Sequence, residues 1–237
     1  MFLQVEINMC GRLNVSDDPF VTKLLANLGV DDSNKTMRYS RMVRATNVIS
    51  IVREKNRKRQ LDDAIWWLLQ EPTEMGFKPS KYTSFNTRYD KLNSPRSAGF
   101  TAYRETRCVI IAKGFGETEG KGINARYYDF CGKQSAIALG GLYRQWLHPN
   151  SQESILSCSV ITLPPHEKLR PYHTKASPLM LPHDDDTINA WLDSSNHNTE
   201  MFADLLRPKI PCDLSVQEIN KPSLFAPIGP LLSIERD

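Results

Sequence analysis

The stretch RCVIIAKGFGE at residues 107–117 indicates the fold most clearly, because an apolar run of strand length leads directly into two glycines and an acid. Runs of this kind, rich in Val, Ile, Leu and aromatic residues and bounded by polar or turn residues, predict β-strands. They recur along the chain without regular alternation with helices. The sequence therefore predicts an α+β fold, a single mixed domain in which peripheral helices surround a curved β-sheet or partial barrel. The predicted strands cover residues 48–52, 64–69, 107–112, 135–142, 155–163 and 178–181.

Helices are predicted at three places. Residues 16–19 read SDDP, which supplies an N-cap and an early proline, and apolar residues then recur at helical spacing over residues 21–28. Residues 187–192 and 199–206 also favour short helices, the second ended by Pro208. The proline-dotted segment that follows is expected to wrap the surface.

A basic stretch, REKNRKR at residues 53–59, lies between two predicted strands. A strand pair needs a polar connection at such a place, so we expect a solvated hairpin loop here. Contact with phosphate is the alternative interpretation.

The composition bounds the function loosely. A chain of 237 residues that is 40% hydrophobic can bury a substantial core. Its formal charge of +3 permits an anionic partner but is far from that of a histone-like nucleic-acid binder. Five cysteines without paired spacing favour a reduced, intracellular protein. No apolar stretch approaches the ~20 residues of a membrane span, so we expect a cytoplasmic protein without a membrane partner. We also expect it to be a monomer.

Residues 9–12 read MCGR, which places a cysteine directly after a methionine. If translation began at Met9 and that methionine were removed, Cys10 would carry a free α-amine beside its thiol. A 1,2-aminothiol condenses with an aldehyde to an imine and then closes a thiazolidine. The eight residues Met1 to Asn8 conflict with this chemistry, because they place the nitrogen of Cys10 in a peptide bond.

Further motifs follow in a fixed order. They are FNTR at residues 85–88, RCVI and GFGE at 107–110 and 114–117, GGLY at 140–143, and His173 ahead of SPLML at 177–181. With the opening MCGR, this series resembles the SOS response-associated peptidase (SRAP) family, whose domain crosslinks to abasic sites in single-stranded DNA. The resemblance divides the chain into an extension, residues 1–8, and one SRAP-like domain, residues 9–237.

The resemblance implies a catalytic set. Cys10 supplies amine and thiol, Glu117 is general acid and base for imine formation, and His173 assists sugar-ring opening and Schiff-base chemistry. Asn86 orients the cysteine adduct. Asn86 and Arg88 stand two apart, so on an extended strand they face the same side. No metal and no cofactor are expected, since the five histidines form no metal-spaced cluster.

The resemblance also implies contacts with single-stranded DNA that carries an abasic site. Arg88 and Arg12 are the candidates for backbone phosphate, because guanidinium groups bind phosphate bidentately. Gly116 and Thr118 depart from the family pattern, which has tyrosine and tryptophan there. We therefore expect either weaker DNA binding or base stacking that uses Trp66, Trp67 or Phe115 instead.

Three functions stay open. The first is a crosslinking, lyase-like enzyme of the DNA-damage response. The second is a self-processing peptidase that cleaves before Cys10, and the third is a non-catalytic nucleic-acid-binding module of the same fold. For the extension we favour a misassigned start codon over self-cleavage. Val5-Glu6 can be encoded GTG-GAG, which contains a ribosome-binding sequence shortly before the Met9 codon.

Overall fold

The computed structural model describes residues 11–30 and 35–237. The prediction for the extension, residues 1–8, and the side chain of Cys10 lie outside the described residues. Three α-helices are described: α1 (Pro19–Asn27), α2 (Phe100–Glu105) and α3 (Asp185–Leu192). The strands are β1 (Arg12–Val15), β2 (Ser40–Arg44), β3 (Val48–Lys55), β4 (Lys58–Ile65), β5 (Gln70–Thr73), β6 (Gly76–Pro79), β7 (Asn86–Arg88), β8 (Arg107–Ala112), β9 (Gly114–Glu119), β10 (Arg126–Gly132), β11 (Ile137–Leu147), β12 (Ser154–Leu163), β13 (Ser177–Pro178), β14 (Met180–Leu181), β15 (Leu214–Ile219) and β16 (Leu232–Ile234).

A closed ring of five strands forms the centre of the fold. Its strands pair in the order β12, β4, β3, β8 and β11, and β11 pairs back with β12. The β4–β12 junction is parallel and rests on the pair Ser157 and Ile65, whereas the other pairs are antiparallel. The predicted α+β fold with a partial barrel and few peripheral helices is thus confirmed.

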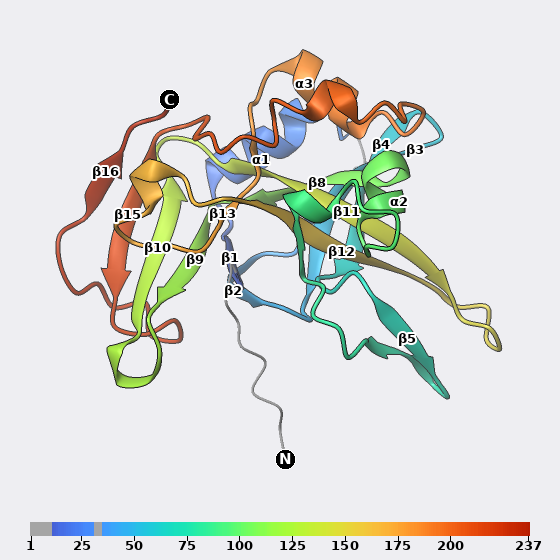
Figure 1. Ribbon diagram of the computed structural model, residues 1–237, viewed down its shortest axis with the longest axis horizontal. Coiled ribbons are helices and arrows are strands. Elements are labelled where there is room, and N and C mark those ends of the chain that lie inside the picture. Colours follow the sequence, from blue (N-terminus) through green and yellow to red (C-terminus); the bar gives the residue numbers. More distant parts are fainter. Residues whose placement is uncertain (1–10, 31–34) are drawn as a thin grey trace.

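A second sheet of six strands lies beside the barrel, in the order β16-β15-β10-β9-β1-β2. Only Lys113 separates β8 of the barrel from β9 of this sheet, so the apolar run at residues 107–112 leads from one sheet directly into the other. Figure 1 shows β9, β10, β15 and β16 side by side on the left, with the barrel strands to their right and α1 and α3 above. One hydrophobic core, which includes Leu13, Phe115 and Ile110, contains residues from both sheets.

The predicted first helix is confirmed as α1. The side chain of Asp18 accepts a hydrogen bond from the Phe20 backbone N–H at 2.8 Å, and Pro19 is the first helical residue. Val21 and Leu24 bury the inner face of the helix. Gly29, at φ +68°, follows the helix in the left-handed region that glycine adopts without strain.

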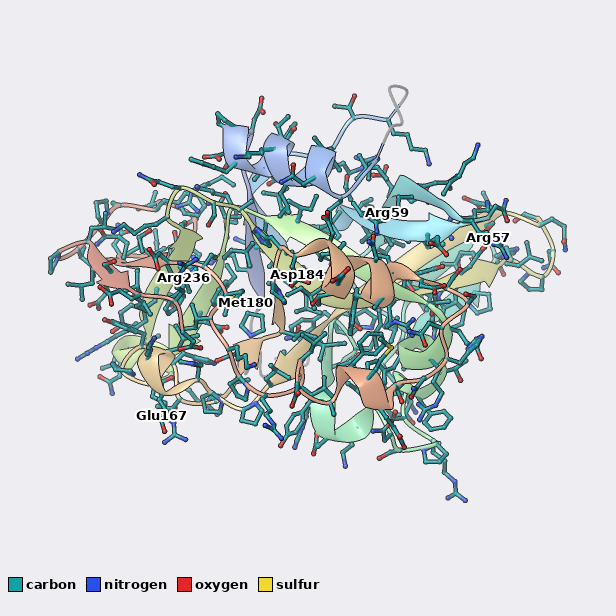
Figure 2. All side chains as sticks on the ribbon, turned by 90° about the horizontal axis from the view of Figure 1, so that it is seen from above. Arg57, Arg59, Glu167, Met180, Asp184 and Arg236 are labelled. Carbon is teal, nitrogen blue, oxygen red and sulfur yellow. The ribbon has the colours of Figure 1, made fainter. Side chains whose placement is uncertain are left out.

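The basic stretch contains a hairpin turn as expected, but only Asn56 and Arg57 form it, and the other residues of the stretch belong to β3 and β4, with Arg53 buried. Strands β3 and β4 pair without interruption up to Lys55 and Lys58, and the two residues between them, Asn56 and Arg57, both have positive φ. This is the backbone of a type I′ turn, whose twist matches that of the strands it joins. Arg59 turns back to the helices: Nη1 donates to the Leu28 carbonyl at 2.8 Å and Nη2 to the Asn189 side chain. Figure 2 shows Arg59 beside α3, which begins after Asp184, and Arg57 farther out along the hairpin.

Three predictions of local structure were wrong. Residues 64–69 are not one strand: β4 ends at Ile65, and the backbone N–H groups of Trp66 and Leu68 donate to the carbonyls of Asn47 and Ser84 in loops. Residues 199–206 form a 3₁₀ turn, Glu200–Phe202, because Thr199 makes no side-chain cap and the hydrogen bonds there join residues three apart.

The C-terminal segment is the third correction. It does not merely wrap the surface, because β15 pairs with β10 and β16 pairs with β15, which extends the six-stranded sheet. Its strands are short and separated by prolines, so local patterning gave no sign of them. Among the described residues, no helix has both the length and the apolar character needed to cross a bilayer.

Candidate active site

Three neighbouring strands place the candidate residues. Strand β9 pairs with β1 on one side and β10 on the other, so Gly116 lies opposite both Arg12 and Asp129. Side chains alternate between the faces of a strand. Glu117 and Glu119 therefore lie on one face of β9, and the space above Gly116 lies on the other.

Glu117 and His173 meet on the first face. Both side chains are buried, 3% and 2% exposed, and His173 Nε2 lies 3.4 Å from Glu117 Oε2. His173 follows the 3₁₀ turn Glu167–Leu169, and its backbone N–H donates to the Leu169 carbonyl at 2.9 Å. The structure thus brings together two of the four predicted catalytic residues, as an acid–base pair shielded from solvent.

A second carboxylate, Glu119, faces the other ring nitrogen of His173. Its Oε2 lies 3.3 Å from Nδ1. The backbone N–H and Oγ1 of Thr174 each donate to this carboxylate at 3.0 Å. Partial burial alone would raise the pKa of Glu119, but these two hydrogen bonds and the neighbouring His173 hold it below its usual value.

Burial dominates the titration of His173. Desolvation lowers the pKa of the imidazole, and the nearby Glu119 carboxylate opposes that effect without cancelling it. The ring is therefore neutral at physiological pH, which is the state that can accept a proton.

A cavity of about 550 Å³ opens beside Glu117. Gly11, the residue that follows Cys10 in the chain, lies in its wall. Thr118, where the family pattern has tryptophan, also faces the cavity, and so does the exposed cation Arg44 on β2. The wall consists of Gly11, Arg12, Met42, Arg44, Ala45, Gly116, Glu117, Thr118, Tyr127, Lys221, Pro222 and Ser223.

Arg12 is held in an ion pair. Its Nη2 lies 2.7 Å from Asp129 Oδ1 and donates to the Tyr128 carbonyl at 3.1 Å, and its side chain is 9% exposed. The other oxygen of Asp129 accepts from Arg41 at 2.8 Å. The Arg12–Asp129 pair passes directly over Gly116, where a Cβ would lie only 1.9–2.2 Å from the guanidinium. The glycine that departs from the family pattern thus provides the space for this guanidinium.

Asn86 and Arg88 lie on β7, which pairs in parallel with β12. Thr87 between them points inward, with its Oγ1 2.8 Å from Ser159 Oγ, which agrees with the expected alternation. Arg88 is exposed and forms two hydrogen bonds with Asp90, at 2.8 and 3.0 Å. A cavity of about 320 Å³ contains Arg88 and Lys175 in its wall, so this strand end lies beside the His173 loop.

The three aromatic residues proposed for base stacking belong to the core, which corrects that prediction. Trp66 is 0% exposed, and its indole N–H donates to the Phe85 carbonyl at 2.8 Å. Trp67 is 8% exposed and packs 5.7 Å from the ring of Phe85. Phe115 stacks on Phe130 at 4.9 Å. The two tryptophans instead fix Phe85, the residue directly before Asn86.

Sequence reasoning missed Glu119 and Asp129. The period-two spacing of Glu117 and Glu119 on a strand could have indicated that both acids share one face. Asp129 carries no comparable signal, since its partners Arg12 and Arg41 come from other strands. Of the residues that the structure describes, no three His, Cys, Asp or Glu side chains are grouped so that they could hold a metal ion.

Sequence comparisons place the chain among known proteins. Residues 9–222 match the model of the family described as SOS response associated peptidase (SRAP). Two curated relatives are the abasic site processing proteins HMCES of Gallus gallus, 24% identical, and of Xenopus tropicalis, 22% identical, each over 162 residues. These matches cover 60% of this chain and 46% of each relative, so the chain spans about half the length of those proteins.

Solved structures share the fold. A protein from Bacteroides thetaiotaomicron superposes with a TM-score of 0.67 at 19% identity, covering 90% of this chain and 93% of that one. A protein from Bordetella bronchiseptica gives 0.66 at 16% identity, covering 90% and 100%. A phage-related protein from Bordetella bronchiseptica gives 0.64 at 13% identity, covering 90% and 95%.

Proposed function

Because this chain belongs to the SOS response-associated peptidase (SRAP) family, we propose that it processes abasic sites in DNA as part of a DNA-damage response. The names of the two curated relatives support this role, since both are abasic site processing proteins. We further propose that the chemistry is covalent capture by Cys10, with single-stranded DNA as the partner.

The observation that carries the proposal is the position of Gly11. A peptide bond keeps the Cα atoms of residues 10 and 11 about 3.8 Å apart. Gly11 shares the wall of the 550 Å³ cavity with Glu117. A sugar aldehyde in this cavity would therefore face a wall that includes Gly11, the neighbour of Cys10 in the chain, and Glu117, whose carboxylate lies 3.4 Å from His173.

The proposed reaction uses the open-chain form of an abasic deoxyribose. The Cys10 amine attacks the aldehyde carbon, and loss of one water gives an imine. The thiol then adds across the C=N bond, sulfur to carbon and proton to nitrogen, which closes a thiazolidine. Glu117 donates the proton that lets the hydroxyl leave as water and accepts it again afterwards.

His173 has a separate role in this scheme. Its burial favours the neutral ring, which can accept the proton of the sugar hydroxyl as the deoxyribose ring opens. The Glu117 carboxyl beside Nε2 can exchange that proton. The pair thus accounts for both proton transfers in this scheme.

The scheme requires a free amine on Cys10. Either initiation at Met9 followed by removal of that methionine, or cleavage of the Met9–Cys10 bond in the longer chain, would expose it. Intact-mass analysis of the protein from its natural host distinguishes these routes from a chain in which Cys10 stays internal. A mass that begins at Cys10 supports the scheme, and one that retains residues before Cys10 contradicts it.

The central test uses protein prepared to begin at Cys10 and a labelled single-stranded oligonucleotide with one abasic site. We expect a covalent band on a denaturing gel from the wild-type chain. Cys10→Ala should give none of the thiazolidine, because it lacks the thiol. Cys10→Ser keeps the amine and should yield an adduct only when borohydride reduces the imine. Binding without any adduct from wild-type protein would favour the non-catalytic module and contradict covalent capture.

We expect Arg88→Ala to weaken DNA capture through the loss of one phosphate contact. Each phosphate contact contributes a slope of about −0.7 to log K against log salt for single strands. The variant should therefore bind less tightly at low salt and show a slope shallower by about that amount in a fluorescence anisotropy titration. Arg207→Ala is the matched control, because Arg207 is also exposed and paired with a nearby acid, Asp204. An unchanged slope for Arg88→Ala would exclude Arg88 from the phosphate path.

A further inference from the structure

We propose that Glu119 is a positioning residue, which fixes the orientation and tautomer of His173 so that Nε2 faces Glu117. This role rests on the proposed function for its effect on catalysis. The tautomer and the proton affinity of His173 can nevertheless be measured on the free protein. Glu119 adds to the proposed active site a carboxylate that does not touch the DNA or the reacting atoms.

His173 has an acidic side chain on each side of its ring. The ring of His173 lies between two acids of the same strand, with Nδ1 3.3 Å from Glu119 Oε2 and Nε2 3.4 Å from Glu117 Oε2. Both distances exceed the ~2.9 Å typical of an N–H···O hydrogen bond, and catalytic contacts of this kind commonly tighten when substrate binds. The ring thus has one carboxylate for each nitrogen.

Two hydrogen bonds from Thr174 hold the Glu119 carboxylate in place. Oε2 accepts from the backbone N–H of Thr174 and Oε1 from its hydroxyl, both at 3.0 Å. Thr174 follows His173 in the chain, so the carboxylate is fastened to the same turn that carries the ring. Glu119 and His173 therefore keep their relative position.

Glu119 also decides which ring nitrogen of His173 carries the proton. The fixed carboxylate of Glu119 favours the tautomer with hydrogen on Nδ1, which leaves the lone pair of Nε2 directed at Glu117. One proton can then pass between Nε2 and Glu117 Oε2. The opposite tautomer would set the lone pair of Nδ1 against the Glu119 carboxylate, which is repulsive, whereas Nε2 meets no such repulsion when Glu117 carries the proton that it delivers as general acid.

Three charged groups face the ring. Glu117 and Glu119 come from β9, and Lys175 comes from the loop of His173 itself. Burial lowers the pKa of His173 most strongly and Lys175 lowers it further, whereas Glu119 and the backbone of Thr118 raise it. Removal of Glu119 should therefore lower the pKa of His173, and removal of Lys175 should raise it.

The experiment is an NMR titration of the ring nitrogens in ¹⁵N-histidine-labelled protein, with His173→Asn to assign the resonance. In Glu119→Gln, we expect His173 to bind its proton about tenfold less tightly, since one charge within 4–6 Å has an effect of this order. We also expect loss of the single Nδ1–H tautomer. Lys175→Met should shift the titration in the opposite direction. Glu71→Gln, which removes an exposed acid paired with Lys78, is the control and should change nothing.

A second readout follows the pH dependence of crosslinking. We assign to His173 the pH below which the crosslinking rate falls. This pH should be lower in Glu119→Gln, by the same amount as the shift in the NMR titration. An unchanged tautomer and an unchanged proton affinity in Glu119→Gln would overturn the inference. If the wild-type chain forms no crosslink at all, the proposed function fails, and the NMR titration still decides the role of Glu119.

Discussion

Replacement of Glu117 by Gln should slow crosslinking to an abasic site by about 10²- to 10⁴-fold, the range that a positioned general acid or base contributes. Gln has nearly the same shape as Glu, so the buried site should keep its packing while losing the group that delivers the proton. The contact between Nε2 of His173 and Oε2 of Glu117 would likewise lose its exchangeable proton. Single-turnover crosslinking rates, measured with protein that begins at Cys10, test this expectation.

The matched control for this variant is Glu153→Gln, which makes the same chemical change at an exposed position in the β11–β12 connection. It should react at the wild-type rate. Circular dichroism and a urea melt of Glu117→Gln establish that the variant is folded. A folded Glu117→Gln protein that crosslinks within threefold of the wild-type rate would remove Glu117 from the proposed mechanism.

Gly116→Ala should lower the free energy of unfolding by about 3 kcal/mol, the order expected when a buried ion pair is broken. The new Cβ would lie 1.9–2.2 Å from the guanidinium of Arg12. That guanidinium has little freedom to move, because it is buried and lies 2.7 Å from Asp129. Any shift that relieves the clash therefore separates Arg12 from Asp129. Urea-induced unfolding measures the loss.

A double-mutant cycle isolates the cause. In an Arg12→Ala background the guanidinium is absent, and Asp129 still has Arg41 as a partner at 2.8 Å. Gly116→Ala should then cost less than about 1 kcal/mol. An equal cost in both backgrounds would show that the added methyl group clashes with something other than Arg12.

The ion pair between Arg12 and Asp129 also limits how Arg12 can contact DNA. By family resemblance Arg12 was a candidate for backbone phosphate, and that role stays a prediction. The guanidinium is engaged by Asp129 on the face of β9 opposite Glu117. Arg88, with its side chain 60% exposed, and Arg44, in the wall of the cavity, have better access to a strand of DNA.

Much of the fold could be predicted from local patterns. The apolar run at residues 107–112 is β8 without any change of bounds, and the cap at Asp18 begins α1 as expected. The basic stretch contains the turn of the β3–β4 hairpin, at Asn56 and Arg57. In each case the signal is local, because a strand, a cap and a two-residue turn depend on neighbours in the chain.

Other parts could not be predicted in this way. Trp66 looked available for base stacking, yet its indole N–H is bound to the Phe85 carbonyl inside the core. Strands β15 and β16 are too short and too interrupted to be recognised until β10 offers an edge to pair with. A side chain's partner is set by register between distant strands, which periodicity in one segment does not encode.

The sequence by itself determined the α+β class, the barrel strands other than β4 and the order of the motifs that assign the chain to its family. These depend on apolar periodicity, turn residues and motif spacing, all of which act along the chain. Only the tertiary structure decided that His173 lies between Glu117 and Glu119, and that Arg12 crosses Gly116 to reach Asp129. The physical reason is that burial and charge pairing join residues from different strands and loops, and they exist only once those elements have packed.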